Sequence, residues 1–85
     1  MILQERIENA GYEPDSVMKI DGYDDCVIGI VESCQSAPVL CYDKEKVILK
    51  NMEDGMTREE AEEYFSFNQI GAYMGESTPC FIELF

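Results

Sequence analysis

Residues 26–42, CVIGIVESCQSAPVLCY, decide the fold of this chain, because they contain two apolar runs joined by a polar connection. The first run, residues 26–31, is apolar at both sets of alternating positions, which is typical of a central strand covered on both faces. The second run, residues 38–42, begins with Pro38, and a strand tolerates proline at its first residue. We therefore expect the two runs to pair as an antiparallel hairpin.

Helix signals surround that hairpin. Asp43 follows the second run, and its carboxylate can accept the free amide hydrogens of a first helical turn. Thr57 and Glu60 have the spacing of a capping box, which is the most specific local signal in the chain. The expected helices cover residues 2–10, 44–53 and 57–72.

Shorter signals complete the predicted fold. Residues 80–85 alternate in hydropathy and indicate a closing strand that pairs with the sheet. Residues 17–20 are interpreted as a short strand that leads into Asp21-Gly22, a dipeptide that suits a two-residue hairpin turn. The sequence thus predicts a single compact α+β domain over residues 1–85, with a small mainly antiparallel sheet of three to four strands packed by two to three helices.

The charge balance is the strongest functional clue. Eighteen Asp and Glu residues accompany six Lys and Arg residues and no histidine, which gives a formal net charge of −12. Such a surface repels DNA, RNA and anionic membranes and attracts basic proteins, because the fields of many like charges add. We therefore expect a basic protein surface as the partner, with no direct contact to nucleic acid or membrane.

Catalysis is the least supported class of function. Histidine, which most often transfers protons near neutral pH, is absent. No glycine-rich phosphate loop occurs, and the four cysteines form no C-x-x-C pair. We expect no enzyme activity, no cofactor and no metal. We expect Cys26, Cys34, Cys41 and Cys80 to be free thiols, mostly buried, the alternative being a Cys26–Cys41 bridge.

Two acidic groups hold the candidate partner-binding residues. The predicted third helix carries Glu59, Glu62 and Glu63, and the turn after residue 20 is flanked by Asp21, Asp24 and Asp25. Helical carboxylates three or four residues apart imitate the repeating charge of a nucleic-acid backbone, although a solvated helix face explains the same pattern. The aspartates fail the spacing of an EF-hand loop. Between the two acidic regions, a small basic patch is expected at Lys44, Lys46 and Lys50.

The segment around residues 67–79 carries further candidates. Asn68 is expected on a buried helical stripe, where it either holds a neighbouring loop or contacts a ligand; we interpret it as a scaffold residue. Tyr73 and Glu76 lie beside glycines in a predicted loop and are candidate partner contacts. The other members of the expected stripe are Ala61, Phe65 and Ala72.

Four segments resemble a group of small acidic proteins encoded by phages and prophages: residues 23–29 (YDDCVIG), 42–43 (YD), 54–57 (DGMT) and, above all, 67–79 (FNQIGAYMGESTP). The resemblance covers about residues 23–82 and implies a mobile-element origin. It supplies no catalytic residue. Because the first residues also lack the basic and long apolar segments of a signal peptide, we expect the cytoplasm of a bacterial host cell.

Two functions follow from these observations. The first is a phage-derived inhibitor that binds a host nucleic-acid-binding or defence protein through an acidic, nucleic-acid-mimicking surface. The second is an acidic interaction or assembly module without mimicry, for which a homo-oligomer is one form. The two differ in salt dependence, because electrostatic capture weakens as salt rises whereas hydrophobic association does not.

Overall fold

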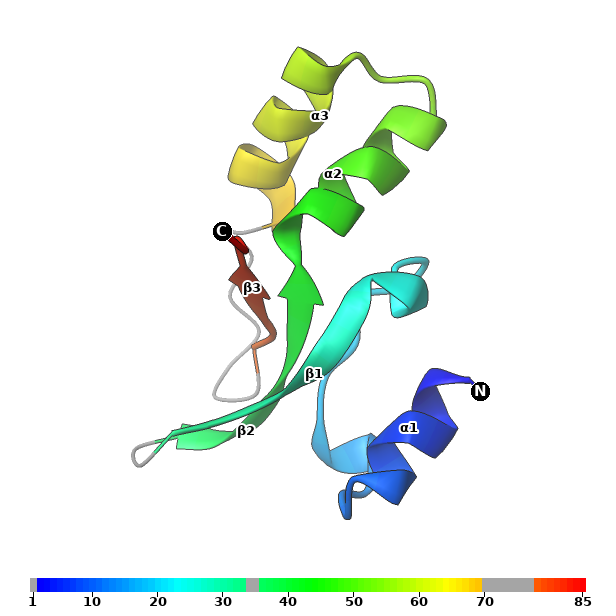
Figure 1. Cartoon of the computed structure of the whole chain (residues 1–85), viewed down its shortest axis with the longest axis vertical. Coiled ribbons are helices and arrows are strands. Elements are labelled where there is room, and N and C mark those ends of the chain that lie inside the picture. Colours follow the sequence, from blue (N-terminus) through cyan, green and yellow to red (C-terminus); the bar gives the residue numbers. More distant parts are fainter. Residues whose placement is uncertain (1, 34–35, 70–77) are drawn as a thin grey trace.

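A three-stranded sheet connects the helices of this chain in the computed structural model, which describes residues 2–33, 36–69 and 78–85 (Figure 1). The elements are, in order, α1 (Leu3–Asn9), the 3₁₀ helices η1 (Pro14–Ser16) and η2 (Asp24–Cys26), β1 (Val27–Ser33), β2 (Ser36–Asp43), α2 (Lys44–Glu53), α3 (Arg58–Tyr64), the π-helix η3 (Phe65–Gln69) and β3 (Cys80–Ile82). The predicted α+β class is confirmed, and so is the mainly antiparallel sheet.

The sheet has the strand order β1-β2-β3. β1 and β2 form the expected antiparallel hairpin, in which Val27 lies opposite Tyr42 and Ile30 lies opposite Leu40. β3 pairs in parallel with the other edge of β2 and brings Cys80 opposite Cys41. The closing strand is therefore present, although it is shorter than the predicted residues 80–85.

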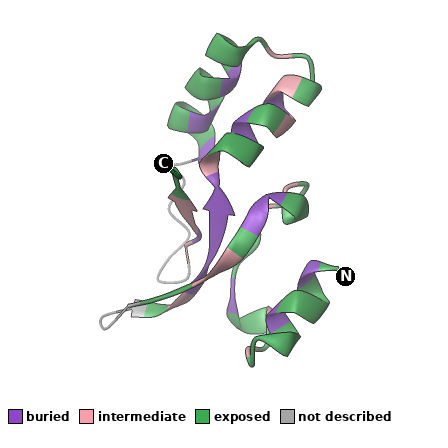
Figure 2. Cartoon of the chain, viewed as in Figure 1, coloured by how far each residue is buried: buried purple, intermediate pink, exposed green. Residues whose placement is uncertain are grey.

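The expected position of the first apolar run is wrong: β1 is an edge strand, and β2 is the central one. Every residue of β2 from Val39 to Asp43 is buried (Figure 2). In β1, by contrast, Ile28 is 38% exposed and Val31 is 40% exposed. The reason is topological, because β3 covers the free edge of β2 and leaves β1 with a single neighbour.

Residues 17–20 are not a strand, which corrects a second expectation. Val17 is buried, but the segment is irregular and joins the core through a side chain, since the Ile20 amide donates to the Tyr42 hydroxyl at 2.8 Å. A turn does form at Asp21-Gly22, and Gly22 adopts a φ of +88°, which glycine tolerates best. Because the preceding backbone bonds to a side chain, the turn closes no hairpin.

The predicted caps are confirmed. The Asp43 carboxylate accepts the Glu45 and Lys46 amides at 2.9 and 3.4 Å, which begins α2 at the residue after the cap. At α3, the Glu60 amide donates to the Thr57 hydroxyl at 3.2 Å and the Thr57 amide donates to the Glu60 carboxylate at 2.9 Å. One core cluster then joins α1, the sheet, α2 and α3, and it includes Ile7, Leu40, Tyr42, Ile48 and Phe65.

The expected burial of Asn68 is wrong. Ala61 and Phe65 are buried as predicted, but Asn68 is exposed and Gln69 is buried instead. The backbone changes from α-helix to π-helix at Phe65, and the wider turn of a π-helix places the next inward position one residue later. Ala72, the last residue of the expected stripe, lies outside the described residues.

A buried amide network forms around Asn51 and Gln69, and Asn68 is not one of the residues in its hydrogen bonds. Asn51 in α2 is fully buried and accepts a hydrogen bond from the Tyr23 hydroxyl at 2.6 Å. Its amide nitrogen donates to the Gln69 side chain at 3.0 Å and to the Ala61 carbonyl at 3.5 Å. This network ties α2 to the segment before η2, to α3 and to η3.

We expect Asn51→Ala to lower the free energy of unfolding by about 2 to 4 kcal/mol, because it removes a hydrogen-bond partner from the half-buried Tyr23 and from the buried Gln69 and leaves a cavity at a fully buried position. Urea denaturation of the purified variant measures the loss. Asn68→Ala is the matched control and should change stability by no more than about 0.5 kcal/mol, as expected for an exposed residue. Equal losses in the two variants would contradict the role of Asn51.

Candidate functional site

The predicted acidic helix is present, and its three candidate residues are exposed on α3 (Figure 2). Glu60, next to them, belongs to the capping box, and its hydrogen bond from the Thr57 backbone lowers its pKa. The capping box thus holds one carboxylate at the start of α3. Glu59, Glu62 and Glu63 remain directed outward along the rest of the helix.

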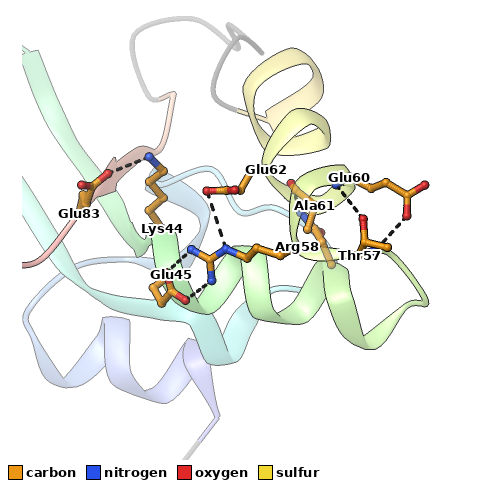
Figure 3. Close-up of polar contacts among 9 residues, drawn as sticks. Lys44, Glu45, Thr57, Arg58, Glu60, Ala61, Glu62 and Glu83 are labelled. Atoms are coloured by element: carbon orange, nitrogen blue, oxygen red, sulfur yellow. Dashed lines mark hydrogen bonds and ion pairs between the residues drawn. The ribbon is translucent and has the colours of Figure 1, made fainter.

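Arg58 partly neutralises this acidic face. Its guanidinium binds the Glu45 carboxylate of α2 with two contacts, at 2.5 and 2.8 Å, and lies 3.7 Å from Glu62 on its own helix (Figure 3). The arginine therefore joins α3 to α2 and compensates part of the charge of Glu62. Within the described residues, Glu59 and Glu63 have no ion-pair or hydrogen-bond partner.

An exposed aromatic ring lies beside these free carboxylates. Phe67 of η3 is 80% exposed, the largest value for a described aromatic residue before the chain end. Shallow hollows flank it on two sides, and Phe67 and Glu63 line both of them. Tyr64, which is 40% exposed, lines one of the two. The α3–η3 face, defined by Glu59, Glu62, Glu63, Tyr64 and Phe67, thus combines negative charge with an apolar centre.

Phe67 was not among the residues predicted from the sequence, although its spacing from Phe65 indicates an outward position. Phe65 and Phe67 are two positions apart, and two helical steps of about 100° place their side chains about 200° apart. Once Phe65 is assigned to the buried stripe, Phe67 must point away from the core. In the π-helix the two rings still point to opposite sides, since Phe65 is 2% exposed and Phe67 is 80% exposed.

The structure does not bring the second acidic group to the same face. Asp21 lies in the turn and Asp24 and Asp25 lie in η2, all exposed, and Asp25 forms an ion pair with Lys50 at 3.3 Å. On α2, Glu45 contacts Arg58 of α3, and Lys50, five positions later, contacts Asp25. Five helical steps place these two side chains about 140° apart around the axis of α2. The two acidic groups therefore meet different sides of α2.

The expected basic patch is largely engaged in contacts to other elements. Lys44 binds Glu83 after β3 at 2.8 Å and lies 5.6 Å from the centre of the Phe65 ring, while Lys50 binds Asp25. Lys46 is exposed and makes no ion pair within the described part of the chain. Because two of the three lysines are neutralised locally, the outer surface keeps its acidic character.

The cysteines of the described ranges are free thiols, with Cys26 and Cys41 buried and Cys80 half-buried; the Cys26–Cys41 bridge does not form. Burial raises the pKa of Cys26 and of Cys41 to about 11, so both thiols are protonated at neutral pH and are poor nucleophiles. Cys34, Tyr73 and Glu76 lie outside the described residues.

Other kinds of site find little support in the described ranges. An apolar groove of about 250 Å³ lies between α1 and the hairpin, lined among others by Leu3, Ile7 and Leu40, and is smaller than the roughly 300 to 1,000 Å³ of ordinary ligand pockets. A second hollow, of about 490 Å³, falls within that range, but six of its eight lining residues are charged, including the Lys44–Glu83 ion pair, whereas ordinary ligand pockets are mostly apolar. These ranges contain no group of three or more residues able to hold a metal ion. None of their helices combines the length and apolarity that a bilayer span requires.

Comparison with protein-family models, curated proteins and solved structures found no match to this chain. No residue role is therefore carried over from a relative, and the phage origin stays a prediction.

We expect the free energy of unfolding to fall as the pH is lowered from about 5 to about 3. Hydrogen bonds from Arg58, the Thr57 backbone and Lys44 lower the pKa values of Glu45, Glu60 and Glu83. A carboxyl group with a lowered folded-state pKa contributes stability above its unfolded pKa of about 4.3, and this stability is lost as the pH falls through the folded pKa. Urea denaturation at a series of pH values measures the change.

Glu60→Gln is the control for this acid effect. A glutamine at this position can still accept the Thr57 amide but does not titrate, so the loss below about pH 5 should be smaller in the variant. A fold that becomes more stable in acid would contradict the prediction. It would show that relief of repulsion among the excess carboxylates outweighs these three interactions.

Proposed function

We propose that this protein acts by binding, and that its α3–η3 face occupies a basic surface of a nucleic-acid-binding or defence protein and inhibits it. The observation that carries the proposal is the exposed Phe67 beside Glu59 and Glu63, two carboxylates without partners in the described residues. The proposal contains no chemical step and needs no cofactor.

The charge density of α3 supports mimicry of a nucleic acid. Glu59, Glu62 and Glu63 fall within four helical steps, a rise of about 6 Å at about 1.5 Å per residue. The three charges therefore have a mean spacing of about 3 Å along the helix axis, close to the about 3.4 Å between successive phosphates of one DNA strand. Arg58 reduces the effective negative charge of this row, because its guanidinium lies 3.7 Å from the Glu62 carboxylate.

The aromatic ring adds contact energy that charge alone does not supply. Exposed ion pairs contribute only about 0 to 1 kcal/mol each, whereas complete burial of a phenylalanine side chain contributes about 1.5 to 3 kcal/mol. Proteins that bind single strands combine a basic groove with aromatic platforms for the bases. A row of carboxylates that ends at an exposed ring presents both features to such a groove.

Long-range attraction fits the same kind of partner. A net charge of −12 favours encounter with a basic protein and opposes encounter with nucleic acid. The resemblance to phage and prophage proteins suggests that the partner belongs to the bacterial host. An inhibitor of this type competes with nucleic acid for the basic surface of its target.

A second candidate function, an assembly module, draws support from exposed apolar residues. Leu84 is 59% exposed, and Phe67 is also a large apolar residue on the surface. Apolar side chains that remain uncovered are typical of interfaces between protein chains. In this alternative the carboxylates only keep the chain soluble, and association should be insensitive to salt.

The first experiment is capture of partners from a bacterial lysate with the tagged protein, at about 50 mM and about 500 mM salt, followed by affinity measurements with the purified partner. We expect the variant Glu59→Lys, Glu62→Lys, Glu63→Lys to bind at least about 100-fold more weakly at the lower salt concentration. Thr57 and Glu60 stay intact, so the helix cap is preserved.

A matched control separates position from net charge. The variant Glu5→Lys, Glu8→Lys, Asp15→Lys reverses three exposed acids near α1 and raises the formal charge by the same six units. It should keep most of the affinity. If the folded α3 variant binds as tightly as the wild type at both salt concentrations, α3 is not the contact, and Asp21, Asp24 and Asp25 become the next residues to reverse.

Phe67→Ser distinguishes the two functions. For the inhibitor, we expect about a tenfold loss of affinity that persists at high salt, because the lost contact is apolar. For the assembly module, the same change should instead abolish self-association measured by sedimentation, with no effect of salt.

A further inference from the structure

The parallel pairing of β2 and β3 places two cysteines side by side. Cys41 and Cys80 are direct partners in the register, although 38 residues separate them in the chain. Neighbouring strands lie about 4.7 to 4.9 Å apart, and disulfides form between residues whose Cα atoms are about 4.4 to 6.8 Å apart. The backbone spacing of the pair therefore already falls in the range that a disulfide requires.

The pairing also brings the two thiol groups close enough to influence each other's titration. A hydrogen bond with Cys80 is one of the causes, after burial and the charge of Cys80, that raise the pKa of Cys41. Cys26, the other buried cysteine, has the Asp25 carboxylate 3.9 Å from its sulfur as its polar neighbour instead of a thiol. Within the described ranges, Cys41 and Cys80 form the single pair of adjacent thiols.

We propose that Cys41 and Cys80 are a dithiol site which a small disulfide such as oxidised glutathione converts into a cross-strand disulfide. This inference is independent of the proposed binding function, because neither cysteine belongs to the α3–η3 face.

The reaction is thiol–disulfide exchange in two steps. The Cys80 thiol, which is the more exposed, loses its proton and attacks one sulfur of the small disulfide, releasing one molecule of the small thiol and leaving a mixed disulfide on Cys80. The raised pKa of Cys41 makes this thiol a slow nucleophile, but the strand register holds it beside the mixed disulfide, which favours the intramolecular reaction. Cys41 loses its proton and attacks the Cys80 sulfur, which forms the Cys41–Cys80 bond and releases the second small thiol. The protein gives up two hydrogen atoms, and the small disulfide is reduced to two thiols.

The bond would anchor the shortest strand of the sheet. β3 has three residues, each paired with β2, and is supported by Phe81, which packs edge-on against Phe65 at 4.9 Å, and by the Lys44–Glu83 ion pair. A covalent link between residues so distant in the chain removes conformational freedom mainly from the unfolded state. Oxidation should therefore stabilise the fold while leaving its backbone unchanged.

The test uses the full chain with Cys26→Ala and Cys34→Ala, so that Cys41 and Cys80 are the remaining cysteines. The folded protein is equilibrated with reduced and oxidised glutathione at several ratios, alkylated and digested with trypsin. Cleavage after Lys19, Lys44 and Arg58 separates the two cysteines into residues 20–44 and 59–85. We expect a disulfide between these peptides, and a midpoint of thermal unfolding about 10 °C higher in the oxidised form.

A second variant with two cysteines tests whether disulfide formation depends on the register that pairs Cys41 with Cys80. Cys34→Ala with Cys80→Ser leaves Cys26 and Cys41, and we expect no bond between them under the same conditions. The inference is overturned if the folded Cys41–Cys80 protein stays a dithiol or stops at the mixed disulfide with oxidised glutathione. It is equally overturned if the bond forms only in urea.

A third digestion covers the case in which the Cys26→Ala, Cys34→Ala protein does not fold. Chymotrypsin cuts the oxidised wild-type chain after Leu40 and Tyr42, which isolates Cys41 from Cys34. A cross-linked peptide that contains Cys41 and Cys80 supports the site, and a different pairing contradicts it.

Discussion

The hydrogen bonds of Asn51 connect three segments of this fold that are separated in the chain. Its side chain accepts from Tyr23 before the hairpin and donates to Gln69 at the end of η3, so one amide joins the start and the end of the helical layer. The carboxamide is fully buried and each of its contacts is internal. Because Gln69 is held inward, the π-helix directs Phe67 outward. The shape of the candidate surface therefore depends on a contact within the core.

The distribution of charge has a similar internal cause. Arg58 binds Glu45, Lys44 binds Glu83 and Lys50 binds Asp25, and each of these pairs joins two different elements. Exposed ion pairs of this kind contribute little stability one by one. Their larger consequence is that three of the six basic residues neutralise acids near α2, which leaves the excess of negative charge elsewhere on the surface.

The candidate surface and the dithiol site lie on different elements and depend on different physics. The α3–η3 face acts at a distance through charge and at contact through Phe67. The cysteine pair depends on the register of β3, a strand of three residues. The two sites share no residue, because Cys41 and Cys80 belong to β2 and β3 and not to α3 or η3.

The sequence alone determined the features that arise within a few residues. The caps at Asp43 and Thr57, the three helices and the hairpin of β1 and β2 follow from local hydrogen bonds and from hydropathy periods, which the chain order displays directly. Tertiary structure decided which strand is central, which amide is buried and where Cys80 lies. These depend on contacts between residues 18 to 39 positions apart, such as Asn51 with Gln69 and Cys41 with Cys80. Periodicity carries no signal for such pairings, because burial at one position is set by whichever distant element packs against it.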